Sequence, residues 1–178
     1  MNYYNEIKQE LINNEIYKKV KDYSKNKNEL ESYYNVGKLI IEAQGGELRA
    51  KYGDNLIKEY SKKLTMELGK GYTVSSLKRM RQFSILKQKG ATLSHQLTWS
   101  HYVELLKFDD INEINYYIDI SINQKLGVRE LRYKIKNKEY ERLPIETKNK
   151  LNISKELKVS ELKKRICRSN RNLYELHR

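Results

Sequence analysis

Residues 71–83, which read GYTVSSLKRMRQF, give the clearest indication of the fold. Thr73 is a good helix N-cap, because its hydroxyl can accept a hydrogen bond from a backbone N–H of the first turn. Gly69 and Gly71 permit the left-handed turn that ends a preceding helix. Apolar side chains then recur at helical spacing, at Leu77, Met80, Phe83 and Leu86. The stretch predicts a turn followed by a helix with one narrow buried stripe.

The remaining faces of this predicted helix carry hydroxyl, amide and cationic side chains, as the second helix of a helix-turn-helix does. Cations of this kind neutralise phosphates, while serine and glutamine fix the register, and arginine or glutamine can reach base edges. The predicted nucleic-acid-binding residues are Lys70, Ser75, Ser76, Lys78, Arg79, Arg81 and Gln82. The alternative is a solvated cationic face on an ordinary packed helix.

The charge of the whole chain favours a negatively charged partner. The 178 residues carry a net charge of +13, with 38% apolar and 33% charged residues, which suits a soluble, helix-rich protein. Residues 62–89 contain eight Lys or Arg and a single acid, Glu67. This local excess strengthens the case for nucleic acid, with duplex DNA as the favoured ligand.

Other features of the sequence argue against a membrane or an oxidising compartment. No run of about 18 apolar residues is present, and the N-terminus lacks a signal-peptide pattern. Cys167 is the only cysteine, so neither an intrachain disulfide nor a cysteine zinc site can form. The expected location is the cytoplasm, with no membrane partner.

Helical periodicity continues along most of the chain, without strand-like alternation. Residues 144–178 differ, because they have ten Lys or Arg against four acids and weaker periodicity. We therefore predict an all-α, multi-helix domain over residues 1–143 and a basic tail or remnant linker over residues 144–178. The helices are expected at 3–23, 30–41, 48–68 (or from a restart at Asp54), 74–88, 99–107, 111–122 and 128–142, with Thr98 and Asp109 or Asp110 as further N-caps.

Catalytic patterns are weak in this sequence. His95 and His101 have no cysteine partner, so we predict no metal site, and His101 is expected to hydrogen-bond a neighbouring backbone. Glu156 and Glu161 begin Glu-x-Lys strings like those of metal-dependent nucleases, but they lie in helix-prone sequence, and we interpret them as decoys. The sequence therefore predicts no catalytic residue, no metal and no cofactor.

The order of several short motifs resembles the N-terminal domain of the YhcG-like bacterial proteins, a family of PDDEXK nuclease domain-containing proteins. One departure is Leu126-Gly127, where the family often has an aromatic residue, and it is expected to anchor the following helix less firmly. The matching pieces are 34–40 (YNVGKLI), 52–53 (YG), 71–73 (GYT), 80–83 (MRQF), 97–101 (LTWSH), 104–106 (ELL), 128–131 (VREL) and 140–142 (YER).

The resemblance implies a nuclease system that acts on DNA, while the family's C-terminal PDDEXK domain is expected to be absent from this chain. Our leading hypothesis is a non-catalytic DNA-binding module. The alternative is a protein-interaction or oligomerisation module that partners a PDDEXK nuclease, and an intact small nuclease is a third hypothesis. The motif residues assigned to holding the helices together are Trp99, His101, Arg129, Tyr140 and Arg142.

Overall fold

The computed structural model describes residues 2–19, 25–46 and 54–149, and these residues form helices and no strand. The all-α prediction is therefore confirmed for the part of the chain that the structure describes. The labelled helices are α1 (Tyr3–Lys19), α2 (Lys25–Ala43), α3 (Asp54–Leu68), α4 (Val74–Gln88), α5 (Trp99–Leu105), α6 (Ile111–Asn123) and α7 (Val128–Lys136). Residues 150–178, with Cys167 and both Glu-x-Lys strings, lie outside the described residues.

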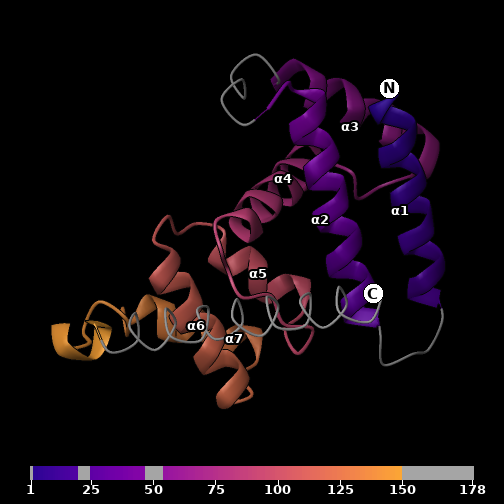
Figure 1. The fold of residues 1–178 in the computed structure, drawn as a ribbon. Helices are drawn as coiled ribbons and strands as arrows, with labels where there is room; N and C mark the ends of the chain where they lie inside the picture. Colours follow the sequence, from indigo (N-terminus) through magenta and orange to yellow (C-terminus); the bar gives the residue numbers. More distant parts are fainter. Residues whose placement is uncertain (1, 20–24, 47–53, 150–178) are drawn as a thin grey trace, which may run out of the picture. The chain divides into compact units, whose positions relative to one another are not determined.

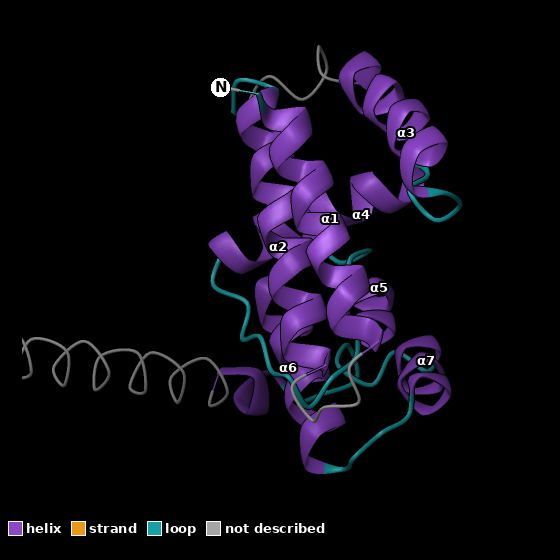
Figure 2. Cartoon of the chain, turned by 90° about the vertical axis from the view of Figure 1, so that its right-hand side faces the viewer, coloured by secondary structure: helices purple, strands orange, loops and turns teal. Residues whose placement is uncertain are grey.

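The chain divides into two compact units, residues 1–133 and 134–178. The division lies ten residues before the expected one at residue 143, and it falls within α7. In the first unit α1 and α2 run side by side in opposite directions, and α4 crosses α2 (Figure 1). Figure 2 shows the same pair of helices from the side, with α3 beyond the end of α4.

Helix α4 begins as the sequence predicts. Thr73 has an extended backbone, and its Oγ1 accepts a hydrogen bond from the Ser76 N–H at 3.2 Å. Gly69 and Gly71 have φ angles of +92° and +124°, which favour glycine over residues with a Cβ atom. The apolar stripe of α4 is buried as expected, and it consists of Leu77, Met80, Phe83 and Leu86. This stripe makes α4 the central helix of the first unit.

Gly37 allows α2 and α4 to approach closely. A Cβ atom at this position would overlap the carbonyl oxygen of Met80 and would lie 2.8 Å from the Cβ of Ser84. A glycine inside a helix costs about 1 kcal/mol relative to alanine, so the sequence alone predicts a local penalty at this position. The close helix crossing explains why glycine is nevertheless used.

An aromatic cluster fixes α5 against α2 and α4. The ring of Trp99 lies 4.7 Å from the ring of Tyr33 and 5.3 Å from that of Phe83, between centroids. Tyr102 packs 5.1 Å from Phe83, and its hydroxyl accepts a hydrogen bond from the Ser94 N–H at 2.7 Å. Tyr33 and Tyr102 therefore line the seams between helices.

Two helices end at lysines in the left-handed backbone conformation, where glycine is usual. Helix α6 ends before Lys125, with φ of +51°, and α7 ends before Lys138, with φ of +54°. In the second case the Glu139 N–H donates to the Lys134 carbonyl, which closes the helix end. The prediction that the last helix extends to Arg142 is therefore wrong, because α7 stops at Lys136.

Within the second unit, ion pairs and one cation–ring contact link the residues that follow α7. Lys134 Nζ lies 3.0 Å from Glu139 Oε1, and Lys138 Nζ lies 3.0 Å from Glu141 Oε2. The ammonium of Lys148 lies 5.0 Å from the centre of the Tyr140 ring. Tyr140 is half-buried, so it packs within a short local structure.

Candidate nucleic-acid interface

The turn between α3 and α4 is fixed by a buried hydrogen bond. The Ser61 hydroxyl on α3 donates to the carbonyl of Tyr72 at 2.8 Å, and the Tyr72 side chain is itself buried. Lys70 lies in this turn and is exposed. The turn therefore holds the start of α4 in a defined position beside α3, with one cation directed to solvent.

Four of the predicted binding residues share one side of α4. Ser75 and Gln82 each lie three or four residues from both Lys78 and Arg79, a spacing that places side chains on the same face of a helix. All four are exposed, on the side away from the buried stripe. We refer to this set as the α4 face, and it consists of Ser75, Lys78, Arg79 and Gln82.

Two other predicted binding residues are turned away from the α4 face. Arg81 is half-buried, and its Nε donates to Gln44 Oε1 on α2 at 2.6 Å. Ser76 is half-buried beside the N-cap, and its hydroxyl lies 3.1 Å from Thr73 Oγ1. The structure thus places Arg81 between two helices and Ser76 at the helix start. The spacing of residues along the helix could have indicated this separation from the sequence.

A groove beside the α4 face brings three arginines together. Its volume is about 530 Å³, and α4, α5 and α7 supply its walls. We call it the arginine groove, and its lining residues are Arg79, Trp99, Ser100, Val103, Glu104, Val128, Arg129 and Arg132. Sequence reasoning assigned two of these residues, Trp99 and Arg129, to holding the helices together, with a surface function as the less favoured alternative, and it did not single out Glu104 or Arg132.

One ion pair crosses the arginine groove. Arg132 Nη2 donates to Glu104 Oε1 at 2.6 Å, and this hydrogen bond lowers the pKa of the Glu104 carboxyl below its ordinary value. The positive charges of Lys107 and Arg79 lower the same pKa further. Among the described residues, Arg79 and Arg129 form no ion pair with an acid. The groove therefore offers two guanidinium groups to an incoming anion.

The wall formed by α7 is held by His101 and Glu130. His101 Nδ1 accepts from the Thr98 N–H at 3.2 Å, and its Nε2 donates to the Leu126 carbonyl at 3.0 Å. Glu130 Oε2 accepts from the Gly127 N–H at 2.6 Å. These two side chains thus anchor the helix start at Leu126-Gly127. The weaker anchoring expected from the missing aromatic residue stays a prediction.

The remaining cations of the predicted basic segment differ in their surroundings. Glu67, the only acid there, is paired with Lys8 and accepts a hydrogen bond from Tyr4. Lys63 pairs with Glu59 at 2.7 Å, and Lys87 lies 3.7 Å from the centre of the Tyr34 ring. Part of the positive charge therefore stabilises contacts within the protein and is less available to a ligand.

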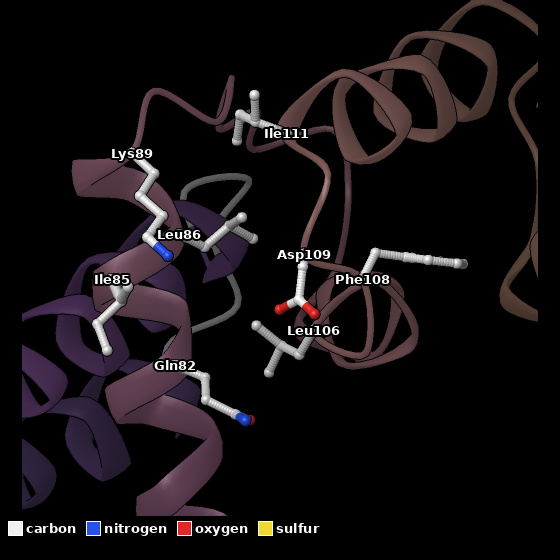
Figure 3. A pocket seen from close by; sticks show the side chains of 8 residues that line it. All are labelled: Gln82, Ile85, Leu86, Lys89, Leu106, Phe108, Asp109 and Ile111. Carbon is white, nitrogen blue, oxygen red and sulfur yellow. The ribbon is translucent and has the colours of Figure 1, made fainter. Parts of the chain in front are cut away.

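A small pocket of about 100 Å³, lined by both apolar and polar side chains, lies beside the C-terminal half of α4 (Figure 3). Ile85, Leu86 and Lys89 border it on the α4 side, and Phe108 and Ile111 border it on the other. Figure 3 shows Gln82 of the α4 face and the carboxylate of Asp109 among the side chains that line it. Phe108 is stacked on Tyr117, with ring centres 5.6 Å apart.

The described residues contain no cluster of His, Cys, Asp and Glu that could hold a metal ion. His95 is exposed, whereas His101 makes the contacts given above, so these two histidines do not form a shared site. Arg142 is exposed in the second unit. No described helix is long and apolar enough to cross a lipid bilayer.

Comparison with known proteins adds a family assignment. The family described as "DUF1016 N-terminal domain" matches residues 6–142. The Escherichia coli (strain K12) protein named "Putative nuclease YhcG" is 29% identical over 144 residues, covering 62% of this chain and 38% of that protein. The chain thus spans well under half of the length of this relative. No solved structure shows a significant match.

The family match covers most of the chain and includes every element that forms the α4 face and the arginine groove. Its range also contains the motifs on which the resemblance rests, from residue 34 to residue 142. The protein therefore belongs to the DUF1016 N-terminal domain family and is related to YhcG, which confirms the resemblance to the N-terminal domain of YhcG-like proteins.

Proposed function

We propose that this chain is a non-catalytic DNA-binding module of a YhcG-like nuclease system, and that it docks on duplex DNA through the α4 face. The observation that carries the proposal is the alignment of Ser75, Lys78, Arg79 and Gln82 on one exposed side of a central helix. The name of the E. coli relative, which describes a nuclease, supports nucleic acid as the ligand class.

The packing of α4 suits it to this role. Its opposite side is buried against the core through Leu77 and Phe83, so its exposed side chains start from a rigid backbone. Rigid helices position binding groups more accurately than loops do. The order of α3, a glycine turn and α4 further supports docking of the helix-turn-helix type, in which the second helix enters the major groove.

The residues of the α4 face would have different roles in DNA binding. Lys78 and Arg79, with Lys70 in the preceding turn, would neutralise phosphates, and these interactions supply most of the affinity. Ser75 and Gln82 would fix the register and could reach base edges, because serine and glutamine both donate and accept hydrogen bonds there. Arg81 has no part in this proposal, since it bonds Gln44.

Titration of a labelled duplex at several salt concentrations tests the proposal. The double variant Lys78→Gln/Arg79→Gln should bind at least tenfold more weakly, and its log–log salt slope should be shallower by roughly 0.9 for each phosphate that is no longer neutralised. Arg81→Gln/Lys87→Gln is the matched control, because it removes the same charges from other sides of the same helix. Equal weakening in both double variants would contradict docking through the α4 face.

A second candidate function is a protein-interaction module that partners a PDDEXK nuclease or a second copy of the chain. The half-exposed apolar side chains around the small pocket favour it, namely Ile85, Leu106, Phe108 and Ile111. Association through such a surface should change little with salt, whereas phosphate binding should weaken steeply. Light scattering of the wild type and of Ile111→Asp, at low and high salt, separates the two functions.

A further inference from the structure

We propose that the arginine groove holds one unpaired nucleotide, so that the protein favours DNA in which a duplex continues into a single strand. The inference rests on the proposed function, because Arg79 belongs to both the α4 face and the groove. A duplex lying along the α4 face would bring its strand end to the residues that line the groove.

The size of the groove fits this ligand. Its volume of about 530 Å³ lies within the range of roughly 300–1,000 Å³ that is usual for small-molecule and cofactor sites. The bases of a duplex are stacked and paired, so they cannot enter such a hollow. An unpaired nucleotide can place its base inside and keep its phosphate at the rim, as in single-stranded recognition generally.

The charges of the groove fit a phosphate. Arg79, Arg129 and Arg132 contribute three positive charges, and Glu104 contributes one negative charge. Because Arg132 is bonded to Glu104, the guanidinium groups of Arg79 and Arg129 are the ones that can bind a phosphate. Guanidinium binds phosphate through two parallel N–H···O bonds, which gives both strength and a fixed orientation.

The aromatic side chain in the groove fits a base. Trp99 is half-exposed there, while contacts with Tyr33 and Phe83 hold its ring on other sides. Val103 and Val128 add apolar surface beside the indole. A cationic groove that contains a fixed aromatic ring is typical of sites that bind single-stranded nucleic acid without sequence preference. A peptide of Asp and Glu residues could use the arginines, but it has no aromatic ring to stack on Trp99.

Trp99 also provides the measurement, because it is the only tryptophan of the chain. Its fluorescence can be followed while the full chain is titrated with a short oligo(dT), a blunt duplex, and the same duplex with a dT overhang. Oligo(dT) and the overhang should quench the fluorescence, and the overhang duplex should bind more tightly than the blunt one. The blunt duplex should change the fluorescence much less.

Arg129→Ala should weaken binding of oligo(dT) about tenfold, because removing a hydrogen bond to a charged group typically costs that much or more. It should leave binding of the blunt duplex nearly unchanged. Arg129 is exposed and lies outside the core, so folding should be retained, which circular dichroism can verify. Arg129→Lys should recover only part of the affinity, since an ammonium lacks the planar fork.

The two proposals fail in different ways. Oligo(dT) binding that leaves Trp99 fluorescence unchanged, or that Arg129→Ala does not affect, would overturn the groove assignment, even if the blunt duplex still requires Lys78. Binding of oligo(dT) that needs Arg129, without any binding of the blunt duplex, would support the groove and contradict the proposed function. A poly-glutamate peptide that displaces oligo(dT) at equal charge would assign the groove to an acidic protein and overturn the inference.

Discussion

The two sides of α4 use the same residue types in opposite ways. On the side towards α2, Gly37 admits the backbone of Met80, and Arg81 is bound to Gln44. On the side towards α5 and α7, Arg79 and Arg129 border an open groove, and neither of these two arginines forms an ion pair among the described residues. A cation two positions away along a helix can therefore be part of the packing or available to a ligand, depending only on the side it occupies.

The comparison also shows why net charge alone identifies a binding surface poorly. Lys63, Lys87 and Arg81 all lie in the basic segment, yet each makes a contact within the protein. Arg79 of the α4 face and Arg129 of the arginine groove stand out, because both are exposed and neither forms an ion pair among the described residues. Substitutions on the side of α4 that packs against α2 are expected to change the free energy of unfolding most, because a new side chain there meets backbone atoms.

Gly37→Ala should destabilise the protein most. Helix propensity alone would stabilise the variant by about 1 kcal/mol, but the new Cβ would overlap the Met80 carbonyl, and overpacking of this kind costs about 1–3 kcal/mol or more. Because the overlap is with backbone, we expect a steric cost of about 3 kcal/mol, at the upper end of this range. Urea unfolding should show a net decrease in stability of roughly 2 kcal/mol.

Gly90→Ala serves as the control for this substitution. Gly90 has a φ of +96° and no neighbouring atom within 4 Å of a Cβ position, so only backbone strain is added, at about 1 kcal/mol. A Gly37→Ala variant as stable as the wild type would contradict the close approach of α2 and α4 at this position.

His101→Ala should loosen the groove side without changing the packing of α2 on α4. It leaves the Leu126 carbonyl and the Thr98 N–H without their partner, and a buried polar group without a partner costs about 1–3 kcal/mol. Hydrogen exchange should accelerate at the start of α7 more than in α2. His95→Ala is the matched control, because His95 is exposed and should change stability by less than about 0.5 kcal/mol.

Arg81→Ala and Arg79→Ala compare two arginines on one helix directly. Arg81→Ala removes the bond to Gln44 and should cost about 1 kcal/mol of stability, whereas Arg79→Ala should cost less than about 0.5 kcal/mol. Binding should show the reverse order, with the larger decrease for Arg79→Ala. Thermal unfolding ranks the two variants by loss of stability, and duplex titration ranks them by loss of affinity. If the same variant were the more affected in both measurements, the assignment of Arg81 to packing and Arg79 to binding would be contradicted.

Local parts of the fold could be predicted from the sequence, because their causes are local. The Thr73 cap, the glycine turn and the buried stripe of α4 depend on residues within a few positions of one another. The end of α7 could not, since Lys138 adopts a conformation that sequence rules assign to glycine, whereas α6 ends at Asn123, within one residue of its predicted end. The end of α7 at Lys136 therefore depends on a backbone conformation that the periodicity of apolar residues does not indicate.

The two parts of the candidate site differ in the same respect. The α4 face depends on residue spacing within one helix, so it could be predicted from the sequence. The prediction also included Arg81 and Ser76, which the structure places on other sides of the helix. The arginine groove requires Arg79 and Arg129 to meet, and fifty residues separate them. Periodicity within a helix does not indicate which helices become neighbours, so the arginine groove could not be predicted from the sequence pattern.

The smallest effect is expected for Glu104, whose protonation changes one charge on the groove side of α4. The hydrogen bond from Arg132 lowers the pKa of Glu104, so the carboxylate stays ionised to a lower pH in the folded protein than in the unfolded chain. Its contribution to stability is thus present above the unfolded pKa and disappears as pH falls through the folded pKa.

Protonation of Glu104 should have the opposite effect on binding. It removes the only negative charge of the groove, so oligo(dT) should bind a few times more tightly as pH falls, and thymine has no group that titrates there. Glu104→Gln should bind more tightly than the wild type at neutral pH and should no longer show this pH dependence. A wild-type affinity that stays flat with pH, followed through Trp99 fluorescence, would mean that the phosphate lies outside the reach of Glu104, and hence outside the arginine groove.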